Sequence, residues 1–280
     1  MGMIPSQVKG LYSTMKTFSM KSTIPRKQVA KNEHFANAWQ NIEQLVSRDE
    51  AQALVASTVN DIRQKTAGHL VAYAWSGGKD SLALQYVCEQ AGIHRCVFCT
   101  SKALEYPAFL QWVYQHHPVG MTTINLDSLS LGWLSEHPEM LFPSEARMNS
   151  RWMEKLQYAG QREYCERFGI RFLILGRRSQ DGNFIGKGGS NIYRTHAGET
   201  RYNPIAHWTH EQVMAVIHYF MHDNLPWVLY GSKDGWTKGT GLWPEREYSW
   251  QEVYDIDPHV VMAASMYINS ARQFLTSIKQ

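Results

Sequence analysis

The residues best suited to chemistry lie in one short loop of this chain, Ser76-Gly77-Gly78-Lys79-Asp80-Ser81. An apolar run that ends at Trp75 precedes the loop, and a helix-like apolar pattern that starts at Leu82 follows it. The order strand, glycine turn and helix directs several backbone N–H groups outward and adds the positive end of a helix dipole. The two glycines permit positive φ and a close approach of the backbone to an anion. The loop therefore predicts a phosphate or pyrophosphate site, with Lys79 as an added cation.

Two better-known phosphate loops do not fit these residues. A Walker A loop requires glycine where Tyr73 stands, and serine or threonine where Asp80 follows the lysine. The dinucleotide fingerprint G-x-G-x-x-G does not match the loop either. The alternative that remains is a glycine turn that merely precedes a core helix.

Two further segments carry side chains suited to a charged ligand, and each directly follows an apolar run. Gly176-Arg177-Arg178 follows the run 171–175, where a Gly-x-Arg turns the chain and aims a guanidinium fork at a phosphate. A surface basic pair is the alternative. Thr100–Pro107 follows the run 96–99 and offers Glu105 as a polar contact to the ribose or base of a nucleotide.

A glycine-rich basic stretch continues from Arg178. Its composition is consistent with a loop that closes over a charged substrate, and equally with a disordered one. The residues concerned are Gly182, Gly186, Lys187, Gly188, Gly189 and Arg194.

Strand-like and helix-like segments alternate along the chain. Strands are expected near 70–75, 96–99, 121–126 and 171–175, with a possible fifth that ends with Asn203-Pro204-Ile205. Helices are expected near 82–91, 107–116, 145–168 and 209–222. This alternation predicts an α/β fold with an open, mostly parallel twisted sheet and helices on both faces. Ligands in such sheets bind beyond the carboxyl ends of the strands, where all three segments above would lie.

Four regions follow from this pattern. We expect a basic flexible extension over 1–32, a helical segment over 33–66, a nucleotide-binding domain over 67–230, and a Gly/Trp-rich loop with one C-terminal helix over 231–280. Asp49 is a candidate cap for a helix in the second region, and Asp257-Pro258 marks the start of the last helix. The extension is either a solvated arm or a segment that binds the phosphates of a nucleic acid or of a partner complex. Its cations precede the first acidic residue, Glu33, and are Lys9, Lys16, Lys21, Arg26, Lys27 and Lys31.

Composition narrows the class of protein. A net charge of +3 on 280 residues does not by itself indicate nucleic-acid binding. No apolar run approaches the roughly 18 residues that a membrane span requires, and lysines interrupt the N-terminus where a signal peptide would be apolar. Four cysteines in 280 residues do not make a disulfide framework. We expect a cytoplasmic protein with no membrane contact.

Together the motifs resemble the phosphoadenosine-phosphosulfate (PAPS) reductase family, a branch of the adenine-nucleotide α-hydrolase superfamily whose pyrophosphate (PP) loop reads Ser-Gly-Gly-x-Asp-Ser. Glu105-Tyr106-Pro107 matches the segment after the family's second strand, and Gly176 with Arg178 matches its later Gly-x-Arg. Further matches are Asn203, Pro204, Ile205, Trp208, Val213 and the turn Leu225-Pro226. The resemblance covers roughly residues 67–245.

The cysteines depart from the family pattern. Sulfonucleotide reductases carry a catalytic cysteine near the C-terminus, whereas no cysteine follows Cys165 here. Met153 stands where many relatives place a cluster-binding cysteine, so no iron–sulfur cluster is expected. Cys96 and Cys99 form a C-x-x-C, but on a strand they point to opposite faces, which favours buried free thiols.

The resemblance implies an enzyme that cleaves ATP at the α-phosphate and adenylates a second substrate, which would be a nucleic-acid position undergoing modification. Ser76, Gly77, Gly78 and Ser81 would hold the pyrophosphate, and Lys79 would neutralise charge on the leaving group. Asp80 would help to place Mg²⁺, and Arg178 would contact the phosphates. The implied cofactors are ATP, or PAPS in its place, and Mg²⁺.

Other interpretations stay open. One is a sulfonucleotide reductase or sulfotransferase acting on PAPS. Another is a non-catalytic adenine-nucleotide-binding module of a nucleic-acid complex, and a third is a structural protein with a vestigial loop. His210 is expected to be structural, Trp236 either stacks a base or packs a lid, and the flanking helices leave room for a homodimer.

Overall fold

A six-stranded sheet forms the centre of the computed structural model, which describes residues 22–25, 30–142, 146–196, 198–221, 235–237, 239–242 and 249–279. The strand order is β3-β2-β1-β4-β6-β5, and all neighbouring pairs are parallel except β5 with β6. The α/β fold predicted from the alternating pattern is therefore confirmed. The strands are β1 (Val71–Trp75), β2 (Cys96–Thr100), β3 (Met121–Asn125), β4 (Phe172–Ile174), β5 (Ile192–Arg194) and β6 (Thr200–Tyr202).

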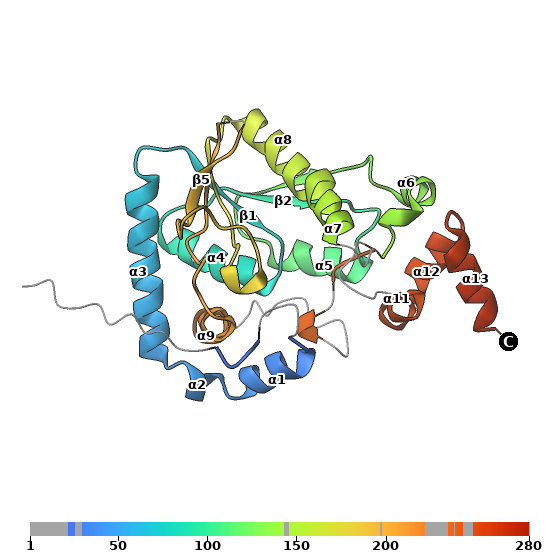
Figure 1. Cartoon of the computed structure of the whole chain (residues 1–280), viewed down its shortest axis with the longest axis horizontal. Helices are drawn as coiled ribbons and strands as arrows, with labels where there is room; N and C mark the ends of the chain where they lie inside the picture. The colour runs from blue at the N-terminus through green and yellow to red at the C-terminus, as the bar shows by residue number, and fades with distance from the viewer. Residues whose placement is uncertain are drawn as a thin grey trace, which may run out of the picture.

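Helices cover both faces of this sheet (Figure 1). One face packs against α3 (Arg48–Thr66), α4 (Lys79–Gln90), α5 (Pro107–His116) and α9 (His210–Phe220) in the largest apolar cluster. The other packs against α8 (Ala159–Phe168), which continues α7 (Ala146–Trp152) and a π-helical turn, Met153–Tyr158. Burial on both faces explains why β1 and β2 read as nearly continuous apolar runs.

Two short helices, α1 (Asn32–Gln40) and α2 (Ile42–Leu45), precede α3 and lie along α9 (Figure 1). The segment before α1 is tied down by Glu211 of α9. Its carboxylate accepts hydrogen bonds from the hydroxyl of Ser22, from the amide and hydroxyl of Thr23, and from the amide of Ile24. Ile24 is buried, so this part of the predicted extension is docked on the fold. Of the six cations predicted there, only Lys31 lies within the described residues.

Several expected helix boundaries are confirmed. Gly169 ends α8 in the left-handed conformation at φ 66°, as its place after the apolar pattern predicted. The hydroxyl of Thr209 accepts from the amide of Gln212 to begin α9, as its capping box predicted. At α3, however, Ser47 and not Asp49 is the cap, and it forms a capping box with Glu50.

The C-terminal region differs from the single helix expected there. It contains α11 (Trp250–Ile256), α12 (Pro258–Ser265) and α13 (Asn269–Ser277). Ile268 is extended, at φ −111° and ψ 117°, and separates the last two helices. The apolar spacing runs on across this break because Val261, Ile268 and Ala271 all join the same core. Helices in the described part of the chain are too short or too polar to cross a bilayer.

Candidate functional site

The loop 76–81 lies at the point where the strand order of the sheet reverses. From β1 the chain proceeds to β2 and β3 on one side of β1, whereas the later strands β4, β6 and β5 lie on its other side in that order across the sheet. Ligands of open α/β sheets bind at the carboxyl ends of the two strands that flank such a switch point. Here those ends lead into Ser76 and Gly176. A Cβ atom placed on Gly176 would lie 3.3 Å from the carbonyl oxygen of Asp80, so the two predicted segments do meet.

The stacked rings of Trp75 and Trp112 form an aromatic floor against which the start of the loop packs. Trp75 donates from its indole nitrogen to Gln85 of α4 over 2.9 Å, and its ring stacks on Trp112 of α5 at 6.0 Å. Gly77 then turns the chain at φ +74°, and a Cβ atom there would lie only 2.8 Å from the Trp112 ring. Glycine is therefore required at this position both by the backbone conformation and by the close approach to the floor.

The helix that follows begins without a side-chain cap. Gly78 is the extended N-cap residue of α4, and within the described residues no side-chain hydrogen bond caps this helix N-terminus. The hydroxyl of Ser81 donates to the carbonyl of Gly78 at 2.9 Å and lies 3.3 Å from the hydroxyl of Ser76, which is exposed. The amides of the first turn and the hydroxyls of Ser76 and Ser81 therefore lie together at the N-terminus of α4, where the helix dipole favours an anion.

Asp80 forms ion pairs with both Lys79 and Arg178. Lys79 Nζ lies 2.7 Å from Asp80 Oδ2, and Arg178 Nε lies 2.7 Å from Asp80 Oδ1. Burial raises the pKa of the Asp80 carboxyl, but Arg178 and Lys79 more than offset this and hold that pKa well below its usual range. Burial lowers the pKa of the Lys79 ammonium, and the Asp80 charge opposes that shift. Asp80 is therefore a carboxylate with a cation on each oxygen.

Arg178 itself is fully buried, with 0% of its surface exposed. Its Nη2 lies 3.0 Å from Asp181 Oδ2 and 2.8 Å from Nδ1 of His210, and its Nη1 donates to the carbonyl of Trp208 over 3.2 Å. In this structure the guanidinium is bound by protein groups. The phosphate contact that the sequence predicted for Arg178 stays a prediction.

Glu105 is enclosed on the neighbouring side. Its carboxyl accepts from the hydroxyl of Thr100 at 3.0 Å, and burial raises its pKa well above the usual range, against the hydrogen bonds of Thr240 and Thr100. The backbone of Gly241 pairs with that of Glu105, and Leu242 donates to the carbonyl of Leu104. This pairing covers the segment after β2, so the predicted contact of Glu105 with a nucleotide stays a prediction.

Aromatic residues from distant segments cover Lys79. Its ammonium lies 5.8 Å from the centre of the Phe35 ring of α1. Phe35 in turn stacks on Trp236 at 6.1 Å, and Trp236 packs against Trp39 at 5.4 Å. In this structure Trp236 is thus part of the cover, one of the two roles that the sequence allowed for it.

Four residues around Arg178 were not identified from the sequence as belonging to a site. Gln180 and Asp181 follow Arg178 directly, but their spacing has no signature. His210 was expected to be structural; the capping box placed it at the first turn of α9, yet nothing in the sequence indicated that its Nδ1 would meet Arg178. Trp208 contributes only its carbonyl, which no side-chain pattern reveals.

The residues of the loop fit a magnesium ion poorly. Both oxygens of Asp80 are engaged by cations at 2.7 Å, which removes the one carboxylate that the sequence offered for Mg²⁺. Within the residues that the structure describes, no group of three or more His, Cys, Asp or Glu side chains is arranged to hold a metal.

The four cysteines are all free and buried, on both faces of the sheet. Cys96 joins the cluster under α4 and Cys99 the cluster under α8, as expected for two residues three apart on a strand. Burial raises the pKa of Cys96 and of Cys99 to about 12 and that of Cys165 to about 11. None of these three is a ready thiolate at neutral pH.

No protein-family model matches the chain, and no curated protein matches it. Among solved structures it is similar to phosphoadenylyl-sulfate (PAPS) reductase from Candida auris in its phosphate complex. The two share 15% identity and a TM-score of 0.44, over 65% of this chain and 89% of that chain. A likeness at this level does not bear on function.

Proposed function

We propose that this chain is a PAPS reductase-like PP-loop enzyme that binds ATP at residues 76–81 and cleaves it at the α-phosphate. The observation that carries the proposal is the loop itself. It joins a buried strand to an uncapped helix N-terminus at the switch point of the sheet, with Gly77 at positive φ and Lys79 beside it. That combination is suited to a pyrophosphate.

The loop residues divide the work between binding and positioning. The first-turn amides and the hydroxyls of Ser76 and Ser81 bind the β- and γ-phosphates, and Lys79 neutralises the charge that develops as pyrophosphate leaves. One well-placed donor of this kind is worth on the order of 3 kcal/mol in the transition state. Asp80 holds Lys79 in place, and Arg178 holds Asp80 from behind.

The reaction we propose is adenylyl transfer. A nucleophilic oxygen or nitrogen of a second substrate attacks the α-phosphorus, and the bond to the bridging oxygen breaks. Pyrophosphate leaves with that electron pair, and the second substrate becomes adenylated. We propose a nucleic acid as that substrate. The same loop would accept PAPS, but the buried cysteines with raised pKa values disfavour a reductase that works through a protein thiolate.

A non-catalytic nucleotide-binding module is a second candidate, and the cover over the loop favours it. Lys79 lies beneath the ring of Phe35, so ATP must displace this aromatic cover to reach the ammonium. A module that senses nucleotides by opening such a cover would bind ATP without releasing pyrophosphate.

Calorimetric titration of the full chain with ATP and Mg²⁺, followed by a pyrophosphate-release assay, tests the proposal. We expect Lys79→Ala to weaken ATP binding at least tenfold. Arg171→Ala is the matched control, because Arg171 is exposed at the opposite end of β4. Equal ATP affinity in wild type and Lys79→Ala would overturn the site. ATP binding with no pyrophosphate released, across single-stranded DNA and RNA acceptors, would instead support the module.

A further inference from the structure

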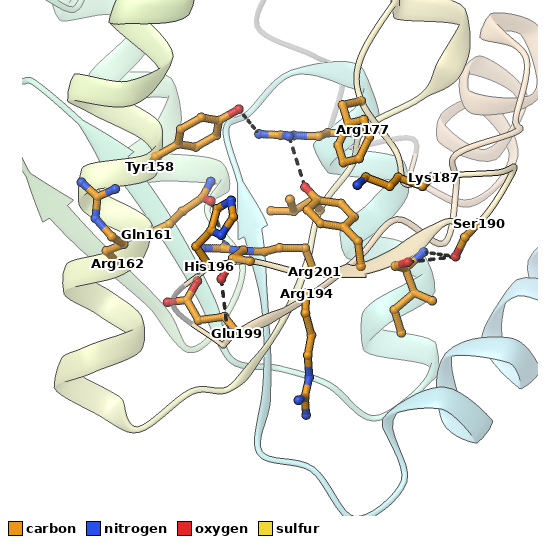
Figure 2. Close-up of a pocket in the computed structure, with 15 residues that line it drawn as sticks. Tyr158, Gln161, Arg162, Arg177, Lys187, Ser190, Arg194, His196, Glu199 and Arg201 are labelled. Carbon is orange, nitrogen blue, oxygen red and sulfur yellow. Dashed lines mark hydrogen bonds and ion pairs between the residues drawn. The ribbon is translucent and has the colours of Figure 1, made fainter.

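A second cavity, of about 860 Å³, lies on the α8 face of the sheet, away from the loop 76–81. It opens between α8 and the antiparallel pair β5–β6, and Tyr158, Gln161, Tyr193 and Arg201 are among the residues that line it (Figure 2). Its volume falls in the range of small-molecule sites, about 300–1,000 Å³, and is large enough for one nucleotide. Nothing in the proposed ATP chemistry uses this cavity.

The cavity is strongly cationic. Arg162, Arg177, Lys187, Arg194 and Arg201 line it, together with His196. Among its described lining residues the one carboxylate is Glu199, and that group is already engaged by Arg201 Nη2 at 2.5 Å. The remaining four cations have no ion pair within the described part of the chain, so their charge is available to an anion.

Arg177 is held by contacts with two tyrosines. Its guanidinium donates to the hydroxyl of Tyr158 over 2.8 Å and to that of Tyr193 over 3.4 Å, and it lies 5.1 Å from the centre of the Tyr158 ring. All of these partners are neutral. The side chain is therefore held in one direction while its charge stays uncompensated, which is the preorganised state that binds a phosphate at low entropic cost.

Aromatic surface accompanies this charge. Phe184 lines the cavity with 52% of its surface exposed, and its ring meets that of Tyr193 edge-on at 4.9 Å. A large exposed aromatic beside cations provides a face on which a nucleobase stacks, worth about 1–3 kcal/mol per base. A phosphate or sulfate without a ring would leave that face unused.

The directions of the cations indicate a chain and not a free nucleotide. In Figure 2 the ammonium of Lys187 points inward toward the middle of the cavity, whereas Arg162 and Arg194 point away from it in different directions. Positive charge thus continues outside the cavity on more than one side. A single nucleic-acid strand that runs through the cavity would contact the cations inside it and those outside it, whereas a mononucleotide would contact only the cations inside.

We propose that this cavity binds single-stranded nucleic acid, with one nucleotide inside it and the flanking phosphates on Arg162 and Arg194. Arg177 and Lys187 bind the phosphate of the inserted nucleotide, and Phe184 stacks its base. This binding does not depend on the proposed function, since it uses no residue of the loop 76–81. If both proposals hold, the two sites are adjacent in the chain, because Arg177 lines this cavity and Arg178 contacts Asp80 of the loop 76–81.

Fluorescence anisotropy with a labelled 12-nucleotide single strand, on the full chain without ATP, tests this assignment. We expect Lys187→Glu and Arg177→Gln each to weaken binding at least tenfold. We also expect each to reduce the slope of log affinity against log salt by roughly 0.7, the value for one phosphate contact on a single strand. Arg171→Glu, a charge reversal at the far end of β4, should leave both quantities unchanged. Matching circular dichroism melts show that the variants are folded.

Two results would overturn the assignment. One is wild-type affinity of Lys187→Glu and Arg177→Gln for the strand. The other is competition by AMP that displaces the strand at equal molar concentration, which would make the cavity a free-nucleotide site. Retained strand binding by Lys79→Ala, which lacks the loop lysine, would support the cavity even where the ATP proposal fails.

Discussion

Arg177 and Arg178 are adjacent in the chain and have opposite environments. Arg178 points toward α4 and is fully buried, and its guanidinium contacts two carboxylates, a histidine nitrogen and a backbone carbonyl. Arg177 points toward the α8 side of the sheet and is partly exposed, and its guanidinium donates hydrogen bonds to two phenol hydroxyls. The first cation is neutralised by protein carboxylates, whereas the second has no ion pair within the described residues. This difference in pairing underlies the two roles that we propose for these arginines.

The largest effect that this comparison predicts is on stability. Arg178→Ala leaves Asp181 without its buried cation and Asp80 with Lys79 alone, and breaking a buried pair costs about 3–5 kcal/mol. Arg177→Ala removes only two hydrogen bonds to hydroxyls at a partly exposed site and should cost less than about 1.5 kcal/mol. Urea unfolding of both variants measures the difference. Equal losses would mean that the two arginines are not distinguished by burial.

Much of this arrangement follows from the sequence, and the part that does not has a physical reason. The loop 76–81 and Gly176 were predictable because the glycines, the lysine and the flanking apolar runs are all local signals. The strand β5 was missed because Ile192–Arg194 is short and lies in a glycine-rich stretch that favours a loop. The direction of Arg178 depends on His210 and Asp181, whose positions are set by tertiary packing and leave no local pattern.

The next effect concerns the two glycine-rich loops. Gly77 and Gly188 both have positive φ, +74° and +59°, but a Cβ atom at Gly77 would meet Trp112 at 2.8 Å while one at Gly188 meets nothing within 4 Å. Gly188→Ala should therefore cost only the conformational strain, about 1 kcal/mol. Gly77→Ala adds overpacking against the aromatic floor, typically a further 1–3 kcal/mol. Thermal unfolding monitored by circular dichroism compares them, and a smaller loss at Gly77 would exclude the floor as a constraint.

The smallest effect distinguishes the two carboxyl groups that follow β1 and β2. Burial raises the pKa of Glu105 well above 4.5, so its contribution to stability is fully present below pH 4.5 and is lost as the pH rises toward the folded-state pKa. The pKa of Asp80 is lowered from 3.8, so its contribution is present above that pH and is lost only as the pH falls through the folded-state value. The two pH windows therefore do not overlap. Glu105→Gln cannot ionise, so the decline in stability that we expect between pH 5 and pH 8 in the wild type should be absent in this variant. Urea unfolding at both pH values checks this, with Asp80→Asn as the matched variant that must leave the decline in place. A decline of the same size in Glu105→Gln would show that this carboxyl does not cause it, and would contradict the raised pKa of Glu105.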